Sequence, residues 1–428
     1  MHKKTQSTRH AQGLSRRDVV KGAAAGAGLV AASSLGFPAV LRAAEDVIRI
    51  GHITPKSGFL GQLGVYGLNG TYLAINEINA AGGILGRQVE LFVEDSVNAG
   101  VAVTKVDKLI NKNKVSALLG EISSGTALAI GSAAARNKTL YINTGANSDA
   151  LRGKNCNRYM FHVEGNNTMY TKTIGNWQLS QNLIKGSKWY FLTADYAFGH
   201  DLRRVSQRFY TGNGGTVVGD DLVPTGTVDF SSYILKIRQA NPDLVYLNLA
   251  GSDQTNFLKQ FREYNLGLPL SGGVMDTLLF WNAGIDAISG YWQSLWYHGL
   301  DQAGSKAFTD AFTRRYGVPP ENQAWGDYIA VKILAQAMTE TKSTKSADLI
   351  GYFESGAKFD LLKDREGMFR KRDHQLLQEM YVVKVKDKGK AADKWDIFDI
   401  VQAAPRKNQS LDTIQPTAEE NPCSLGAL

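Results

Sequence analysis

The sequence predicts an α/β protein of two lobes, each built on a parallel β-sheet with helices on both faces. Nearly continuous apolar segments alternate with amphipathic segments, a pattern typical of buried parallel strands and the helices that connect them. The alternation occurs as two separate series, over about 47–145 and 188–273. The chain also has 428 residues, which is more than a single hydrophobic core usually holds.

The first series alternates four strands with helical segments. The strands are expected at 47–53, 89–95, 116–122 and 139–145, with helices at 67–81, at 99–113 and in an alanine-rich segment after 123. The helix over 67–81 follows a glycine-rich loop and carries apolar residues three or four positions apart. Gly82 and Gly83 predict its end, because glycine readily adopts the left-handed backbone of a helix C-terminus.

The second series restarts the same pattern. Strands are expected at 188–195, 216–223, 242–250 and 268–273, with helices at 199–212, 231–240 and 252–265. A further helix is expected at 323–338, followed by late strands at 381–387 and 394–401. The polar, proline-containing segment after 402 predicts an extended tail along the surface.

Residues 1–44 predict an export signal that is not part of the fold. The segment SRRDVVK (15–21) precedes a weakly apolar segment and a small-residue exit, and its paired arginines indicate the twin-arginine type. Cleavage is expected near Ala43 or Ala44, and export places the mature chain in the periplasm. No segment after residue 45 has about 18 uninterrupted apolar residues, so no membrane span is predicted there.

The charge of the chain gives no reason to expect nucleic acid as a partner. The whole chain has a formal net charge of +8, but residues 1–44 contain seven Lys or Arg and one Asp, a net +6. The mature part therefore carries about +2. Basic patches interleaved with aromatic residues are absent as well.

The motifs of common enzymes and metal sites are also missing. The sequence has no GxSxG turn, no P-loop, no HExxH and no Cys/His group with metal-ligand spacing. His200 lies near Asp195 and Asp201 in the sequence, but an acid–base role for this group is disfavoured. We expect a protein that is not an enzyme and has no cofactor or metal.

Cys156 and Cys423 are the two cysteines of the chain. In an oxidising compartment, an even number of cysteines favours a disulfide over two free thiols. Such a bond would fix the C-terminal tail to a distant loop.

Polar, small-residue loops follow two neighbouring strands of the first series. They are Ser123-Ser-Gly-Thr126 and Asn143-Thr-Gly-Ala-Asn-Ser148, and helical sequence follows each. Helix N-termini offer unpaired N–H groups, so the two loops together are suited to a compact anion such as a carboxylate. The alternative is that the serines only cap their helices. In the second series the loops at 193–200, 250–253 and 272–277 face this position and would close a cleft.

Several ordered motifs resemble one protein family. They are the segment INEINAAGGILGR (75–87) before VELFVEDS, the glycine-rich segment 56–64, the segment DYAFG from Asp195 and the segment DFS from Asp229. Together they resemble the periplasmic substrate-binding proteins of branched-chain amino acid ABC transporters. The resemblance covers about 47–400.

The resemblance implies a type I periplasmic binding fold, with ligand held between two lobes that three crossing segments join. Lobe 1 is then expected at 45–162 and 299–373, lobe 2 at 163–298 and 374–402, and an extended tail at 403–428. The implied partners are a small carboxylate ligand and the transmembrane subunits of an ABC permease. The protein is expected to be a monomer.

The resemblance also assigns candidate ligand-binding residues. In the family the serine turn and the next loop hold the ligand carboxylate, and an aromatic residue of each lobe covers the ligand. The matching positions here are Ser123, Ser124, Gly145, Ala146 and Asn147 for the carboxylate, with Phe198 and Leu63 at the covering positions.

Three positions depart from the amino-acid-binding pattern. Val274 occupies the place of the acidic residue that pairs with the ligand ammonium, and Asp276 lies two residues further on. Gly251 stands where a tyrosine often assists. A buried ammonium without a partner is costly, so either Asp276 substitutes or the ligand lacks an amine. Aromatic or aliphatic carboxylates are the ligands in the second case, and Leu63, Tyr196 and Phe198 would suit them.

The predicted function is therefore that of a solute receptor for an ABC importer, which closes on a small carboxylate by a hinge motion. A soluble sensory binding module of the same fold is the second hypothesis. An enzyme is the third and least favoured hypothesis.

Overall fold

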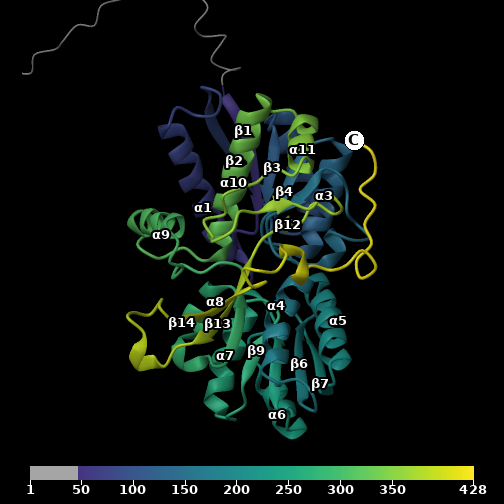
Figure 1. The fold of residues 1–428 in the computed structure, drawn as a ribbon, viewed down its shortest axis with the longest axis vertical. Coiled ribbons are helices and arrows are strands. Elements are labelled where there is room, and N and C mark those ends of the chain that lie inside the picture. The colour runs from purple at the N-terminus through teal and green to yellow at the C-terminus, as the bar shows by residue number, and fades with distance from the viewer. Residues whose placement is uncertain (1–46) are drawn as a thin grey trace, which may run out of the picture. The chain divides into compact units, whose positions relative to one another are not determined.

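The computed structural model describes residues 47–428, so the predicted export signal lies outside the described residues. The first parallel sheet has five strands in the order β2-β1-β3-β4-β5, and every neighbouring pair is parallel (Figure 1). The strands are β1 (Val47–Thr54), β2 (Gln88–Asp95), β3 (Ala117–Gly120), β4 (Leu140–Asn143) and β5 (Met160–His162). The connecting helices are α1 (Gly61–Ala80), α2 (Ala99–Asp107) with a π-helical turn (Lys108–Lys112), α3 (Ser124–Arg136) and a short 3-10 turn (Asp149–Leu151).

The second parallel sheet has four strands in the order β7-β6-β8-β9. The strands are β6 (Lys188–Ala194), β7 (Thr216–Val223), β8 (Leu244–Asn248) and β9 (Leu270–Gly272). The helices are α4 (Asn167–Ser180), α5 (Ala197–Gly212), α6 (Ser231–Ala240), α7 (Gly251–Tyr264), α8 (Thr277–Ala283) and a 3-10 turn (Ile285–Ala287). The two sheets confirm the two predicted series and the α/β class with two doubly wound lobes.

The last third of the chain adds elements to both lobes. The strands β10 (Tyr291–Ser294), β13 (Met380–Val385) and β14 (Phe398–Ala404) form an antiparallel sheet, and β11 (Met368–Phe369) and β12 (Leu376–Leu377) form a hairpin. The remaining helices are α9 (Ala303–Tyr316), α10 (Asn322–Thr341) and α11 (Ser346–Glu354), with 3-10 turns at Lys388–Lys390 and Leu411–Ile414. Helix α10 packs on α1, and β10 and β13 pack on α4. We call the first sheet with its helices, the hairpin and α9–α11 lobe 1, and the second sheet with its helices and the antiparallel sheet lobe 2.

Helix α1 differs from the sequence prediction at its start. It begins at Gly61, within the segment expected to be a glycine-rich loop, and not near residue 67. The glycines on its inner face allow close packing, because a Cβ at Gly67 would collide with the Asp327 carboxylate and one at Gly70 with the Ala324 carbonyl of α10. The predicted end is confirmed, with φ angles of 101° at Gly82 and 82° at Gly83.

Three connections pass between the lobes, after β5, after β10 and after β12. The first and third run side by side, since His162 N donates to His374 O at 3.0 Å and Gln378 Nε2 donates to Val163 O at 2.6 Å. Arg152 is fully buried beside them. This arrangement matches the three-segment hinge implied by the resemblance.

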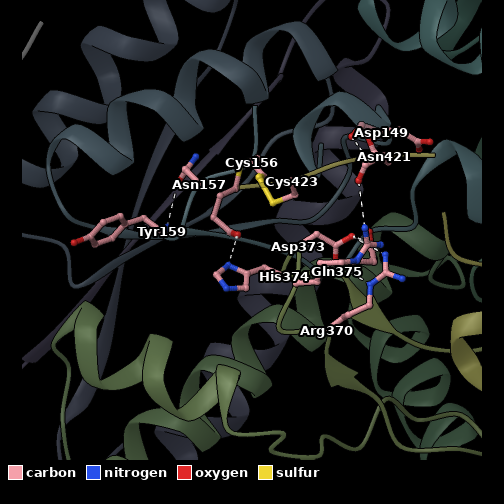
Figure 2. The surroundings of a disulfide bond; sticks show 12 residues. Asp149, Cys156, Asn157, Tyr159, Arg370, Asp373, His374, Gln375, Asn421 and Cys423 are labelled. Atoms are coloured by element: carbon pink, nitrogen blue, oxygen red, sulfur yellow. Dashed lines mark hydrogen bonds and ion pairs between the residues drawn. A yellow bond between two sulfur atoms is a disulfide. The ribbon is translucent and has the colours of Figure 1, made fainter. Parts of the chain in front are cut away.

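The C-terminal tail is fixed to the rest of the molecule. Cys156 and Cys423 form a disulfide bond, which Figure 2 shows together with its surroundings. The tail is not only a surface segment, because Ile414 and Gln415 are each 2% exposed. Asn166 Nδ2, at the start of α4, donates to Gln415 Oε1 at 3.0 Å, so the tail packs against a connection between the lobes.

Candidate functional site

Loops at the carboxyl ends of both parallel sheets meet between the lobes. The rings of Phe59, after β1, and Tyr196, after β6, lie 5.7 Å apart between centroids in an edge-to-face arrangement. Ser252 N, in the first turn of α7, donates to Phe59 O at 3.0 Å. The N-terminus of α3 also approaches that of α5, because a Cβ at Gly125 would lie 4.0 Å from the Ala197 Cβ. The candidate site is therefore closed in this structure.

The serine turn stands at the start of α3, as predicted. Ser123 is the N-cap residue and is partly exposed, whereas Ser124 is fully buried. Ser148 N donates to Ser124 Oγ at 3.2 Å, so the serine turn and the next loop are in direct contact. With a lone pair of Ser124 Oγ taken, the hydroxyl hydrogen remains able to donate to an anion.

The loop after β4 has little freedom. Asn143 holds Ala146 from both sides, because its Oδ1 accepts from Ala146 N at 3.0 Å and its Nδ2 donates to Ala146 O at 2.8 Å. A Cβ at Gly145 would lie 2.6 Å from Gln323 Oε1, so only glycine fits without a shift. Asn147 Nδ2 donates to Glu164 Oε1 at 2.9 Å, which directs this amide towards the first connection between the lobes.

The predicted aromatic positions separate into two kinds. Phe198 is 2% exposed and its ring lies 5.6 Å from that of Tyr196, so it supports the aromatic contact from inside lobe 2. Leu63 is 1% exposed within α1 and belongs to the hydrophobic core. Sequence reasoning missed Phe59, which is the aromatic residue of the first loop, because Leu63 was expected to lie in that loop.

Gly251 lies where α7 of lobe 2 comes close to the Phe59 loop of lobe 1. Its φ of 56° is in the left-handed region, and a Cβ there would collide with Phe59 O. The tyrosine that is expected at this position in amino-acid binders would therefore not fit the closed arrangement. Val274 is 6% exposed and packs in the hydrophobic core, while the side chain of Asp276, two residues on, is only partly buried.

Asp276 faces lobe 1 across the site. Asn322 Nδ2, at the start of α10, donates to Asp276 Oδ1 at 2.9 Å. Glu321, the N-cap residue of α10, is fully buried, and its Oε1 accepts from Ala324 N at 3.0 Å. Within residues 47–428, Glu321 Oε2 has no hydrogen-bond partner.

A third carboxyl group comes from the connection after β5. Glu164 is 2% exposed, and its Oε1 accepts three hydrogen bonds: from Tyr170 Oη at 2.6 Å, from Asn147 Nδ2 at 2.9 Å and from Gly165 N at 2.9 Å. Sequence reasoning missed Glu164, Glu321 and Tyr170. Each belongs to a segment that approaches the cleft only through packing of the lobes, and the helix start at Glu321-Asn322 was the one local signal.

The three carboxyl groups have raised pKa values. Burial raises the pKa of Asp276 to about 6. Burial raises the pKa of Glu164 to about 8, with the charge of Asp276 adding to the effect, although hydrogen bonds and Arg152 oppose it. The pKa of Glu321 is raised by burial and by the charges of Asp276 and Glu164. For Asp276 and Glu321, no lysine or arginine of the described chain is among the main contributors.

Other chemistry finds little support. In the described part of the chain, no three His, Cys, Asp or Glu residues are placed to hold a metal ion. His200 Nε2 lies 2.9 Å from Asp195 Oδ1, and both side chains are nearly half exposed, as expected for a surface ion pair. None of the helices within 47–428 has the length and apolar character needed to span a bilayer.

A family model described as periplasmic binding protein matches residues 47–390. The chain belongs to this family. The Leu/Ile/Val-binding protein homolog 8 of Brucella suis is 28% identical over 325 residues, which make up 72% of this chain and 79% of the relative. The crystal structure of a periplasmic binding protein from Burkholderia mallei has a TM-score of 0.81 at 27% identity and covers 89% of this chain and 99% of that chain.

Two ligand complexes share the periplasmic binding fold at 23% identity. One is LivJ from Streptococcus pneumoniae with isoleucine, with a TM-score of 0.72 and coverage of 83% of this chain and 99% of that chain. The other is a solute binding protein from Rhodopseudomonas palustris with 3,4-dihydroxybenzoic acid, with a TM-score of 0.75 and coverage of 83% and 96%. These two likenesses show the fold, and the family match makes this chain a periplasmic binding protein.

Proposed function

We propose that this protein is the exported receptor of an ABC importer, and that it closes its two lobes on a small carboxylate that carries an amino group. The receptor is not an enzyme, acts in the periplasm as a monomer, and delivers its ligand to the transmembrane subunits of a permease. The predicted twin-arginine signal at 1–44 supports the periplasmic location.

The carboxylate subsite is assigned to the serine turn and the loop after β4. Ser124 is buried at the start of α3, where the first-turn N–H groups are free of intrahelical partners. Gly145, Ala146 and Asn147 lie next to it through the Ser148–Ser124 hydrogen bond. Ala146 N already donates to Asn143 Oδ1, so the backbone N–H groups of Gly145 and Asn147, with the Ser124 hydroxyl beside them, are the donors that suit a carboxylate.

The amino group is assigned to Asp276. The observation that carries this assignment is the meeting of Asp276 with Asn322 across the closed cleft at 2.9 Å, beside Glu321. An amide can donate to Asp276 but cannot neutralise it. A ligand ammonium placed here supplies the missing charge, whereas an additional carboxylate without an amine would increase the repulsion.

Carboxylates that lack an amine are the second candidate. The aromatic contact of Phe59 with Tyr196 favours them, because these rings would pack against an apolar or aromatic ligand. The aromatic-acid complex of the Rhodopseudomonas palustris protein shows that the fold accommodates such a ligand.

The test compares ligands that differ only in the amine. Leucine is titrated by calorimetry against 4-methylpentanoate, and phenylalanine against 3-phenylpropanoate. We expect the amino acid of each pair to bind at least tenfold more tightly. Equal or tighter binding of the amine-free acids would reject the amine and leave the second candidate.

A pair of variants tests the carboxylate subsite. We expect Ser124→Ala combined with Asn147→Ala to weaken binding of the tighter ligand by tenfold or more, which corresponds to about 1.5–3 kcal/mol for lost charge-assisted hydrogen bonds. Ser132→Ala is the matched control, since this serine is exposed on the same helix. Unchanged affinity in the double variant would reject the assignment of the carboxylate subsite to these two loops.

A further inference from the structure

The cleft contains three carboxyl groups, which is more than are needed to pair with one ligand ammonium. Asp276 comes from the loop after β9, Glu321 from the start of α10 and Glu164 from the connection after β5. Three separate segments thus bring acidic side chains to one place. We propose that the cleft recognises a second, positively charged nitrogen group on the solute, and that Glu321 and Glu164 are the residues that select it. This inference rests on the proposed amino-acid-type function.

Unused hydrogen-bonding capacity points to a ligand at this position. Glu321 is fully buried and Asn322 is 1% exposed. In the described chain neither Glu321 Oε2 nor Asn322 Oδ1 has a hydrogen-bond partner. Both atoms are acceptors, and the Asn322 amide already reaches Asp276 through its nitrogen. Buried acceptors without donors are costly, so a ligand with N–H donors is the group that would satisfy them.

Oε1 of Glu164 acts as a hydrogen-bond acceptor. It receives hydrogen bonds from Tyr170, Asn147 and Gly165, which favour the ionised carboxylate and oppose the effect of burial on its pKa. The guanidinium of Arg152 donates to the backbone oxygens of Glu164 and Gly165.

A charge count gives the class of the solute. A bound cation favours the ionised form of these carboxyl groups. Arg152 and Lys363 are cations that act on Glu164, whereas no lysine or arginine of the described residues is among the main contributors at Asp276 and Glu321, which supply two negative charges when ionised. An α-ammonium alone leaves an excess of negative charge in a closed, poorly hydrated cleft. A second ammonium or guanidinium balances it. The expected solutes are therefore amino acids with a basic side chain.

The experiment uses three pairs of amino acids matched in shape. The full chain without bound ligand is titrated with lysine against norleucine, ornithine against norvaline, and arginine against citrulline. We expect the charged member of at least one pair to bind tenfold or more tightly than its partner. Neutral members that bind as well as the charged ones, or no binding by any charged member, would overturn the inference.

The outcomes separate this inference from the proposed function. Tight norleucine or leucine binding keeps the amino-acid function and rejects only the second nitrogen. Binding confined to 4-methylpentanoate or 3-phenylpropanoate rejects the proposed amine as well.

A variant tests the role of Glu321. We expect Glu321→Gln to reduce the preference for the charged member over its neutral partner at least fivefold. Glu340→Gln is the matched control, because Glu340 is exposed near the other end of α10. An unchanged preference in Glu321→Gln would show that Glu321 does not select the group.

A second inference comes from the C-terminal tail and rests on different contacts. Near its end the tail is tied to lobe 1 by the disulfide between Cys423 and Cys156 and by Asn421 Nδ2, which donates to Asp149 O at 2.8 Å (Figure 2). We call residues 415–423 the hinge strap.

The hinge strap also binds lobe 2. Glu420 forms ion pairs with Lys172 of α4 at 2.9 Å and with Arg208 of α5 at 3.3 Å. Lys172 Nζ also donates to Gln415 O at 2.8 Å. A covalent attachment to one lobe and charged contacts to the other span the junction. The geometry points to a strap that restrains opening of the lobes.

The strap is tested on the protein without ligand. We expect Cys156→Ser with Cys423→Ser, and separately Glu420→Gln, to increase the radius of gyration measured by small-angle X-ray scattering. Glu420→Gln keeps the disulfide, so it remains informative where loss of the bond impairs folding. Lys236→Gln is the control, because Lys236 of α6 pairs with Asp221 of β7 within lobe 2. A radius of gyration in Glu420→Gln equal to that of the control would overturn the inference.

Discussion

Asn322 Nδ2 lies 2.9 Å from Asp276 Oδ1, and this hydrogen bond joins α10 of lobe 1 to the loop after β9 in lobe 2. Closure of the lobes thus brings a neutral amide, and the buried carboxyl of Glu321, to an acidic side chain. The closed state is electrostatically incomplete without a cation between the lobes.

The first prediction concerns pH and lobe opening in the protein without ligand. In the closed cleft, burial raises the pKa of Asp276 to about 6 and that of Glu164 to about 8. Opening rehydrates both groups and returns their pKa values towards the ordinary range near 4, so the closed form binds more protons. Closure is therefore favoured at low pH and disfavoured as the pH rises through these values.

We expect the radius of gyration of the ligand-free protein to increase between pH 5 and pH 8.5. The neighbouring ionisable groups do not reverse the direction of this change with pH. Burial raises the pKa of Glu321 as well, and the pKa values of Tyr170 and Tyr196 are raised above the pH range tested. Asp276→Asn should reduce the change, while Asp310→Asn, at an exposed position of α9, should not. A radius that stays constant or falls with pH would contradict the prediction.

The second prediction concerns the contact between Gly251 and Phe59. In Gly251→Ala the new Cβ would collide with Phe59 O only when the lobes are closed. The φ of 56° adds strain of about 1–2 kcal/mol for a non-glycine residue in either state. We expect the affinity for the best amino-acid ligand to fall at least tenfold, or about 1.4 kcal/mol, with a small loss of thermal stability.

Calorimetry and scattering together check the Gly251 prediction. The ligand-free variant should have a larger radius of gyration than the unmodified protein. Gly212→Ala is the matched control, because this glycine ends α5 of the same lobe and a Cβ there meets open space. Full affinity in Gly251→Ala would show that the lobes close without this contact.

Local sequence patterns predicted the layers of the fold but not the composition of the site. Strand and helix periodicity found both parallel sheets, since a buried parallel strand is apolar along its whole length. At the start of α1 the glycine-rich sequence predicts a loop, because propensity disfavours glycine in helices, whereas packing on α10 requires glycine at Gly67 and Gly70.

The acidic side chains of the cleft illustrate the limit of sequence reasoning. Asp276 was identified from its place after a strand, near the position where the family has an acid. Glu164 and Glu321 lie 157 positions apart in the sequence and share the cleft with Asp276 through the hinge and the docking of α10. No local pattern encodes that meeting, because it depends on how the lobes close.

The third prediction concerns the buried guanidinium of Arg152. Its Nε donates to Gln375 Oε1 at 2.7 Å, and its terminal nitrogens donate to Ala146 O at 2.9 Å and Glu164 O at 2.8 Å. Lysine cannot reproduce this planar set of donors, so Arg152→Lys leaves buried acceptors unpaired. We expect the free energy of unfolding of Arg152→Lys, measured in urea, to be lower than that of the unmodified protein by about 3 kcal/mol or more. The free energy of unfolding of Arg238→Lys, at an exposed position of α6, should stay within about 0.5 kcal/mol of that of the unmodified protein. An equal loss in both variants would reject this structural role for Arg152.

The fourth prediction concerns Glu121, which lies between β3 and the serine turn. Glu121 is fully buried with a φ of 75°, and its Oε1 accepts from Ser123 N at 2.7 Å. Burial raises the pKa of Glu121 to about 7, with a contribution from the charge of Asp95. The folded protein therefore holds this proton more tightly than the unfolded chain does. The stability that Glu121 contributes is fully present below pH 4.5 and is lost as the pH rises through 7.

Glutamine at position 121 keeps the acceptor for Ser123 N but cannot ionise. We expect the melting temperature of Glu121→Gln, relative to the unmodified protein, to rise between pH 5 and pH 8.5, because the unmodified protein then carries a buried charge that costs about 3 kcal/mol. Glu366→Gln, at an exposed position, should show no such trend. A difference that is independent of pH would mean that Glu121 stays ionised in the folded protein throughout this range, held by the N–H groups of the serine turn. In that case those groups would be less available to a ligand carboxylate, and the carboxylate subsite would depend on Ser124 and the loop after β4.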